Sequence, residues 1–278
     1  MGGKVKLERT RDVARIWIER PDVHNAFDDE VIAGLTAAVR EASAHPRVRV
    51  IVLGGRGRSF SAGADLAWMA RAATWTAEQN SEDAGRLAAM LRALSSSPKV
   101  TVARVQGAAV GGGMGLVAAC DMAIATTRAR FGLSEVKLGL IPAVISPHVI
   151  EKIGVGRARA LFVTGERFDA AFAERIGLVT RVVEDDEALD LAIEEVIAEV
   201  RTSGPDAVRA AKELVRVVPT LPEDQVDAWT AEQIAQRRAT PEAREGMSAF
   251  LEKRTPPWSV RRDESGEGFT AAEDDEDE

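Results

Sequence analysis

The sequence predicts an α/β fold that is followed by an all-helical C-terminal part. Over roughly the first 200 residues, short β-branched runs alternate with helically spaced apolar residues, a pattern typical of α/β layering. Two glycine-rich turns follow such runs, as expected where a strand passes into a helix. From about residue 185 onward, helical spacing continues without any strand pattern. With 278 residues, 45% of them hydrophobic, the chain is long enough to bury a large core.

Local sequence patterns predict each strand and helix of the N-terminal part. Alternating residues 5–8 and 14–18, with a turn at Arg11-Asp12, predict a β-hairpin. Asp28 or Asp29 can cap a helix whose apolar stripe begins at Val31. Further strands are expected over residues 48–53, 100–105 and 122–125, and further helices over 87–94 and about 113–119.

The C-terminal part shows four helical patterns, over residues 189–200, 207–217, 224–237 and 242–251. Residues 202–205, Thr-Ser-Gly-Pro, are the best linker. We therefore expect an α/β core over residues 1–200 and a helical region over 201–258. Residues 259–278 are expected to form a disordered acidic tail.

The charge distribution argues against a nucleic-acid binder. The formal net charge is −8, but residues 263–278 carry nine acids and no base. Residues 1–262 therefore hold 36 bases and 35 acids, a net charge of +1, without the basic excess that nucleic-acid binding needs.

Membrane, export and metal signals are weak. The N-terminus lacks the apolar stretch of a signal peptide, and the uncharged run 105–120 is too short and glycine-rich for a membrane span, so we expect a cytoplasmic protein without membrane partners. Cys120 is the only cysteine and sits in an apolar run, which favours a buried inert thiol over a nucleophile. The three histidines are far apart in sequence, and no metal site is expected.

Two glycine-rich turns are the first candidates for chemistry: Ser59-Phe-Ser-Ala-Gly-Ala-Asp-Leu66 and Gly107-Ala-Ala-Val-Gly-Gly-Gly-Met-Gly-Leu116. Where a strand passes into a helix, the first N–H groups lack internal partners and can hold negative charge. A single turn of this kind more often serves tight packing. No Lys-Ser/Thr pair follows the glycines, which excludes a phosphate-binding P-loop.

Glu135 is the third candidate, in Phe131-Gly-Leu-Ser-Glu-Val-Lys-Leu. Its neighbours Leu133 and Val136 are apolar. Either it is a partly exposed glutamate that caps the next turn, or it is a carboxylate in a dry pocket. A dry pocket would raise its pKa toward a value suited to proton transfer near neutrality.

Taken together, these motifs resemble the enoyl-CoA hydratase/isomerase (crotonase) superfamily, from Arg20-Pro-Asp-Val-His-Asn-Ala-Phe27 to Phe250-Leu-Glu-Lys-Arg254. Within it, the runs 103–107, 111–121 and 140–147 look most like bacterial methylglutaconyl-CoA and isohexenylglutaconyl-CoA hydratases. The resemblance implies a spiral of ββα units and makes region 201–258 a trimerisation region, in a homotrimer or a dimer of trimers. It implies no cofactor other than the coenzyme A of the substrate.

The resemblance also implies site residues. Glu135 matches a catalytic glutamate, and the backbone N–H groups of Ala64 and Gly112 match the two donors to the thioester oxygen, an oxyanion hole. Positions that match the substrate- and CoA-binding stretches are Asp22, Val23, Ala26, Ala62, Asp65, Leu66, Gly115, Phe250 and Lys253. Phe250 and Lys253 would reach the nucleotide end of CoA from a neighbouring subunit.

The sequence departs from the two-carboxylate hydratases at Gly115, where those enzymes have a second glutamate. Gly115 either relieves charge and leaves room beside the acyl group or simply lets its helix pack closely. Glu78 and Asp83 could supply the missing acid, although a solvated helix face is the commoner explanation of both. His148 could reach the acyl end, but a surface histidine is the more frequent case.

Three functions are therefore compared. The first is reversible hydration of a 2-enoyl-CoA, branched as in leucine degradation, for which 3-methylglutaconyl-CoA is an example. The second is Δ3,Δ2-enoyl-CoA isomerisation, which needs only one glutamate. The third is a non-catalytic role such as RNA binding, which the balanced charge of residues 1–262 disfavours.

Overall fold

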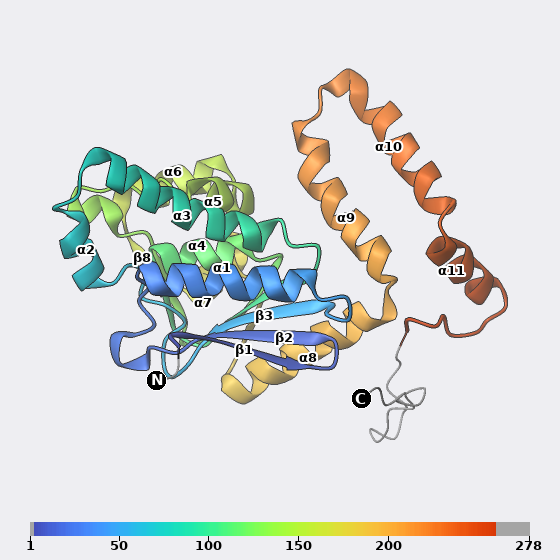
Figure 1. The fold of residues 1–278 in the computed structure, drawn as a ribbon, viewed down its shortest axis with the longest axis horizontal. Coiled ribbons are helices and arrows are strands. Elements are labelled where there is room, and N and C mark those ends of the chain that lie inside the picture. The colour runs from blue at the N-terminus through green and yellow to red at the C-terminus, as the bar shows by residue number, and fades with distance from the viewer. Residues whose placement is uncertain (1–2, 260–278) are drawn as a thin grey trace. The chain divides into compact units, whose positions relative to one another are not determined.

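The computed structural model describes residues 3–259, and the chain divides into two compact units, the first ending at Glu194 and the second beginning at Glu195. The first unit holds both β-sheets, and the second consists of helices (Figure 1). This arrangement confirms the predicted α/β class with a helical C-terminal part. The predicted boundary at residue 200 falls inside helix α8 (Asp186–Thr202), and the division into three parts stays a prediction. Of the expected acidic tail, all but Ser259 lies outside the described residues.

The larger sheet has six strands in the order β1-β2-β3-β4-β6-β9, and only the pair β1/β2 is antiparallel. Its strands are β1 (Val5–Thr10), β2 (Val13–Ile18), β3 (Val50–Gly55), β4 (Val100–Val105), β6 (Met122–Thr126) and β9 (Arg181–Val183). The smaller sheet has the order β5-β7-β8, with β5 (Ala108–Val110), β7 (Arg130–Gly132) and β8 (Arg167–Asp169). The predicted hairpin is confirmed, and its turn residue Arg11 has a left-handed φ of 55°.

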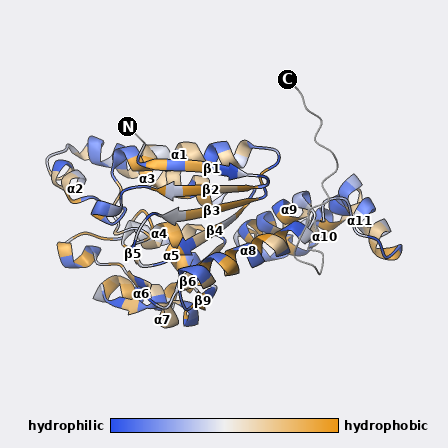
Figure 2. Cartoon of the chain, turned by 90° about the horizontal axis from the view of Figure 1, so that it is seen from below, coloured by the Kyte–Doolittle hydropathy of each residue, from blue (hydrophilic) through white to orange (hydrophobic). Residues whose placement is uncertain are grey.

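Helices connect and cover these sheets. In the first unit they are α1 (Asp29–Ala44), α2 (Leu66–Ala72), α3 (Ala77–Ser95), α4 (Gly112–Ala119), α5 (Ser146–Ile153), α6 (Val155–Thr164) and α7 (Ala170–Arg175). Short 3-10 turns are η1 (Pro21–Val23) and η2 (Glu135–Leu138). Beyond α8, the second unit contains α9 (Pro205–Val217), η3 (Val218–Thr220), α10 (Glu223–Arg238) and α11 (Pro241–Leu251). In Figure 2, α8, α9 and α10 each carry both hydrophilic and hydrophobic residues.

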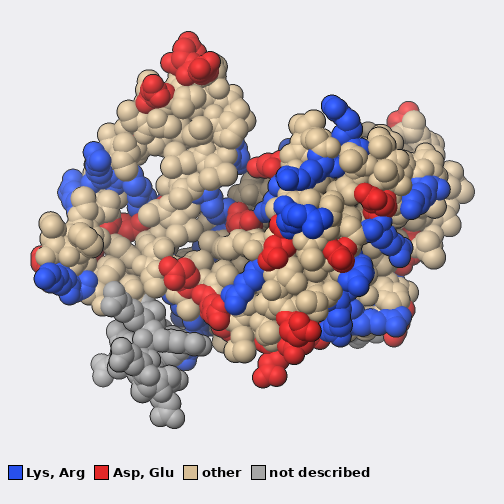
Figure 3. Space-filling view, turned by 180° about the vertical axis from the view of Figure 1, so that it is seen from behind, with Lys and Arg blue, Asp and Glu red and all other residues tan. Residues whose placement is uncertain are grey.

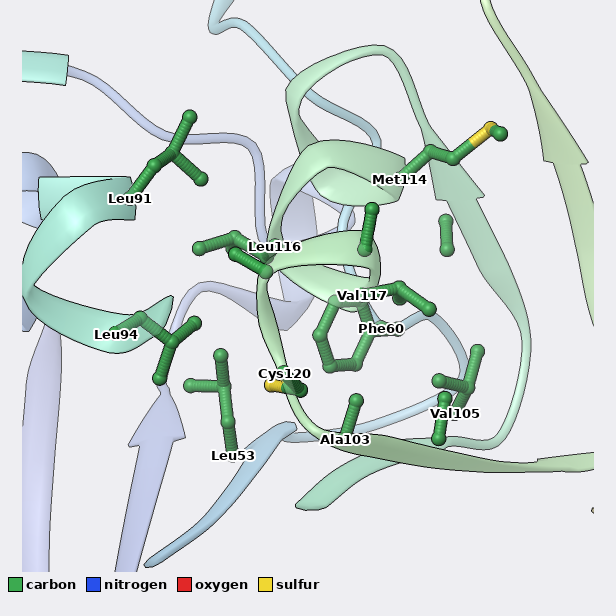
Figure 4. Packing of buried hydrophobic residues seen from close by; sticks show 14 of the residues in the cluster. Leu53, Phe60, Leu91, Leu94, Ala103, Val105, Met114, Leu116, Val117 and Cys120 are labelled. Carbon is green, nitrogen blue, oxygen red and sulfur yellow. The ribbon is translucent and has the colours of Figure 1, made fainter. Parts of the chain in front are cut away.

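The core of the first unit surrounds helix α4, which is buried from Gly113 to Ala119. Met114, Leu116 and Val117 of this helix pack with Phe60 and with residues of α3 and the sheet (Figure 4). Cys120 ends the helix and is buried in the same cluster, which agrees with an inert core thiol. The core therefore fixes α4, whose first residues form the second glycine-rich turn.

Two features of the exterior bear on partners. On the face drawn in Figure 3, basic and acidic side chains are interspersed, in keeping with the balanced charge of residues 1–262. Within residues 3–259, no helix is both long and apolar enough to cross a membrane.

Candidate active site

The two glycine-rich turns lie against each other. Ser61 and Ala109 form a parallel bridge, which brings the segment after Phe60 alongside β5. Gly63 has φ +86°, and a Cβ there would lie 2.7 Å from the carbonyl oxygen of Val110 and 3.4 Å from the nitrogen of Gly112. Only glycine allows both this conformation and this close approach. The backbone just before Ala64 therefore touches the backbone at Gly112.

The N–H groups of Ala64 and Gly112 are both left without an internal acceptor. Phe27 N–H donates to the Gly63 carbonyl (2.8 Å) and Asp65 N–H donates to the Phe27 carbonyl (3.0 Å), so the N–H of the residue between them, Ala64, points away from Phe27. Gly112 is the first residue of α4, where an N–H has no partner within the helix. Among residues 3–259, neither N–H donates a hydrogen bond.

The Glu135 carboxylate lies beside this pair of turns. A Cβ built on Gly111 would be 3.2 Å from Glu135 Oε1, so the carboxylate lies against the residue that precedes Gly112. Its other oxygen, Oε2, is buried and has no hydrogen-bond partner among the described residues. Burial raises the pKa of Glu135 above its ordinary value of 4.5. The site thus combines free N–H donors with a carboxylate whose pKa is raised by burial.

The two stretches expected to line CoA are brought together. Ala62 N–H donates to the His24 carbonyl (2.9 Å), which extends the pairing of Phe27 with the segment 63–65. Of the six predicted residues in these stretches, Asp22, Val23, Ala62 and Leu66 are exposed, Asp65 is partly buried and Ala26 is buried. That these six residues bind CoA stays a prediction.

Asp65 already has partners within the protein. Its Oδ1 accepts from the N–H groups of Ala67 (2.8 Å) and Trp68 (3.1 Å) and so caps α2, and its Oδ2 accepts from Arg20 (2.9 Å). Burial alone would raise the pKa of Asp65, but these hydrogen bonds hold it below its ordinary value. The Arg20 guanidinium also donates to the Ala26 carbonyl (2.5 Å). Arg20 and Phe27 were not predicted as site residues, because their contacts with Asp65 and Gly112 are tertiary and leave no pattern in the sequence.

The space next to Gly115 is filled. A Cβ on Gly115 would lie 2.3 Å from Cγ2 and 2.8 Å from Cβ of Ile145. Real Cβ atoms do not approach other atoms so closely, so the side chain of Ile145 takes the place where a longer residue would stand. Of the two explanations of Gly115, close packing therefore fits the structure, and open room beside the acyl group does not.

The other candidate acids and bases differ in their surroundings. Glu78 is exposed on the first turn of α3, and buried Asp83 accepts from Arg86 (2.9 Å). His148 is half-buried on α5, and burial lowers its pKa. Phe250 and Lys253 are exposed in the second unit. Across residues 3–259, no group of three or more His, Cys, Asp and Glu side chains could hold a metal ion.

A partly buried carboxylate and two backbone N–H groups without an internal acceptor thus lie on adjoining turns of this fold, an arrangement that can exchange a proton and stabilise a negative charge. Residues 8–261 match the family model described as Enoyl-CoA hydratase/isomerase. The chain is similar to the crotonyl-CoA hydratase of Syntrophomonas wolfei (32% identity, 89% of this chain and 95% of that one) and to the short-chain-enoyl-CoA hydratase of Clostridium acetobutylicum (31% identity, 90% and 95%). It is also similar to the crystal structure of an enoyl-CoA hydratase from Shewanella pealeana, with 38% identity, a TM-score of 0.88 and coverage of 92% of this chain and 96% of that one.

The chain therefore belongs to the enoyl-CoA hydratase/isomerase family, and it is an enzyme with the crotonase fold. The family implies an acyl-CoA thioester as its substrate. The predictions of superfamily, fold class and enzyme are confirmed.

Proposed function

We propose that this enzyme reversibly hydrates a 2-enoyl-CoA thioester through an enolate whose oxygen is held by the N–H groups of Ala64 and Gly112. The observation that carries the proposal is the contact between the two glycine turns, with both N–H groups free and the Glu135 carboxylate against Gly111. Relatives named as crotonyl-CoA and short-chain-enoyl-CoA hydratases support the reaction. Donors placed in this way act more strongly on the charge that develops in the transition state than on the bound substrate.

Glu135 then carries out both proton transfers of the reaction. Its carboxylate takes a proton from water as the water oxygen bonds to C3, and the C2–C3 π electrons move to the thioester oxygen as the enolate forms. The protonated Glu135 returns the proton to C2, and the thioester carbonyl re-forms. The raised pKa of Glu135 suits this double role, because a group that must both accept and donate works best when its pKa lies near the working pH.

CoA binding is proposed for the paired stretches that contain Asp22, Val23, Ala26, Ala62 and Leu66. Asp65 contributes by holding α2 and Arg20 in place, since both of its oxygens accept hydrogen bonds from the protein. Phe250 and Lys253 are proposed to reach the nucleotide end of CoA from another subunit of a homotrimer or a dimer of trimers. A cytoplasmic location stays a prediction.

We further propose a branched acyl group that carries its own carboxylate, such as 3-methylglutaconyl. Gly115 supplies no second acid to repel that carboxylate. His148 follows Ile145 by three residues, which puts it on the same side of α5 as the residue that packs on Gly115. Burial lowers the pKa of His148, and both an acid, Glu151, and a base, Arg92, act on it.

The second candidate function, Δ3,Δ2-enoyl-CoA isomerisation, is favoured by one observation. Ile145 occupies the space beside Gly115, which leaves Glu135 as the carboxylate of the site, and isomerisation needs only one. A panel of crotonyl-, 3-methylcrotonyl-, 3-methylglutaconyl- and 3-enoyl-CoA tests both reactions. Hydration that is fastest with 3-methylglutaconyl-CoA supports the proposal, whereas turnover of 3-enoyl-CoA alone establishes the isomerase and contradicts the hydratase.

A further inference from the structure

Phe27 contacts both halves of the proposed oxyanion hole. Its backbone pairs with the segment that carries Ala64, through the hydrogen bonds to Gly63 and from Asp65. Its ring points at Gly112: a Cβ built there would lie 2.2 Å from Cζ, 2.9 Å from Cε2 and 3.2 Å from Cε1. One residue therefore links the backbone next to each free N–H group.

The surroundings of Phe27 make this link stiff. The side chain is 1% exposed and belongs to the main core cluster. Arg20 donates to the carbonyl of Ala26, just before Phe27, and to Asp65, just after Ala64. Backbone hydrogen bonds and a buried ring thus hold the segment on both sides of the contact.

We propose that Phe27 is a positioning residue that sets the separation of the Ala64 and Gly112 N–H groups. This inference rests on the proposed function, because it gives those two groups their role. The first donor is held by backbone pairing, and the second is held because the ring fixes how near Gly112 can come. Donors of an oxyanion hole must be held to within about 0.5 Å of their working positions, so a change in the ring alters the hole without touching the substrate.

A positioning role for Phe27 predicts a lower kcat with little change in KM. A positioning defect weakens stabilisation of the developing oxyanion, which lowers kcat, whereas the backbone hydrogen bonds that hold the CoA-lining stretches do not depend on the ring and KM changes little. Phe27→Leu and Phe27→Met both shorten or reshape the side chain at the Gly112 contact. The control is Phe168→Leu: Phe168 in β8 is buried and stacks on Phe131 at 5.7 Å, and β7 separates its strand from β5.

The test measures steady-state hydration of crotonyl-CoA and, separately, the absorption spectrum of a bound 3-aryl-enoyl-CoA. Hydrogen bonds to the thioester oxygen polarise the conjugated chain and move its absorption to longer wavelength. We expect both Phe27 variants to lower kcat by roughly 10- to 100-fold, less than complete loss of a donor, with KM within about threefold and a smaller spectral shift. Phe168→Leu is expected to keep kcat within about threefold and the full shift, even if it lowers the melting temperature equally.

The results that would contradict the positioning role differ from those that would contradict the proposed function. A wild-type enzyme that hydrates crotonyl-CoA and shifts the spectrum, with a folded Phe27→Leu or Phe27→Met variant that does both equally well, overturns the positioning role alone. Equal losses of kcat in the Phe27 variants and in Phe168→Leu also overturn it, because general loosening of the core then explains the effect. A wild-type enzyme without turnover and without a spectral shift overturns the proposed function and this inference with it.

Discussion

At the scale of single residues, the site depends on a carboxylate whose charged form is destabilised by burial. Glu135 Oε2 is buried without a hydrogen-bond partner among the described residues, and burial raises the pKa of the group. A buried polar atom without a partner calls for an explanation, and a role in proton transfer is one. The sequence pointed to this residue through its apolar neighbours, but it gave no sign of the contact with Gly111, which depends on the three-dimensional approach of η2 to α4.

Glu135→Gln is predicted to lower kcat by about 10²–10⁴-fold, because the amide can neither accept nor return the proton. Circular dichroism confirms that the variant is folded, and steady-state kinetics with crotonyl-CoA measure the loss. In the wild type, kcat/KM is expected to fall as the pH drops through the raised pKa of Glu135, since the base is then protonated. Wild-type rates in the folded variant would remove Glu135 from the mechanism.

The same substitution is predicted to stabilise the protein at neutral pH. The folded state holds the Glu135 proton more tightly than the unfolded state, so the free energy of unfolding of the wild type falls as the pH rises from the ordinary pKa of 4.5 through the raised one. Glu135→Gln removes this penalty, and the two proteins should be equally stable below both pKa values. Urea unfolding at acid and neutral pH measures the difference; a less stable variant at neutral pH would contradict the burial argument.

Gly115 is predicted to be a packing residue. Gly115→Ala should cost about 1–3 kcal/mol of unfolding free energy through overpacking against Ile145. In the double variant Gly115→Ala/Ile145→Ala, the two costs should be less than additive by at least about 0.5 kcal/mol. Gly85→Ala in α3 is the control, because a Cβ there meets nothing within 4 Å, and it should stabilise the helix by roughly 0.5–1 kcal/mol. Additive costs at positions 115 and 145 would disprove the contact.

At the scale of elements, the strands and helices with a clear apolar pattern were predictable, whereas their ends and the shortest strands often were not. Strand β4 begins and ends as predicted, and Asp28 does cap α1 by accepting from Val31 N–H (3.0 Å). Helix α3 begins at Ala77, ten residues before its apolar stripe, because Thr76 and Gln79 form a capping box. Strand β3 is displaced two residues from the predicted run 48–53. The second sheet was missed because each of its strands has three residues, too few for a periodic pattern.

The candidate site was also predictable only in part from the sequence. Glycine motifs mark the two turns in the sequence, because a strand passing into a helix leaves N–H groups free, and the resemblance to the family assigned Ala64 and Gly112 within them. The contacts that align them could not be predicted, since Phe27 and Arg20 act through tertiary neighbours. The sequence also could not show that Ile145, 30 residues away, fills the space beside Gly115.

Helix α2 offers a prediction at this scale. Asp65→Ala removes its cap and leaves Arg20 without the 2.9 Å partner next to Ala64, so it should cost about 1–3 kcal/mol in stability and lower kcat by roughly tenfold or more. Asp169→Ala is the matched control: Asp169 caps α7 by accepting from Phe172 N–H (2.8 Å) and lies in β8, which β7 separates from β5. It should lose about 0.5–2 kcal/mol of stability with kcat unchanged. Equal kinetic effects in the two variants would show that Asp65 acts only as a helix cap.

At the scale of the whole molecule, the helical unit carries apolar side chains that face solvent. Val215, Phe250 and Leu251 are 71%, 83% and 79% exposed, and Leu214, Ile234 and Met247 are also exposed. Apolar surface of this kind marks an association site. It agrees with the proposed trimer, although a pattern in the sequence alone does not show which side chains remain uncovered.

Truncation after Ser203 is predicted to abolish assembly and to yield an aggregated or insoluble product. Light scattering after size exclusion should give three or six copies for the full chain, because the exposed apolar residues of α9 to α11 are then covered by neighbouring subunits. A soluble and active monomer from the truncated chain would refute the assembly and would remove Phe250 and Lys253 from the CoA site.

The central claim, proton transfer by Glu135 through a thioester enolate, is tested most directly by NMR of crotonyl-CoA incubated with the enzyme in ²H₂O. The wild-type enzyme is predicted to form 3-hydroxybutyryl-CoA with one deuterium at C2, and Glu135→Gln is predicted to do so at least about 100-fold more slowly. Hydration without deuterium at C2, or equal rates for the two folded proteins, would contradict the account.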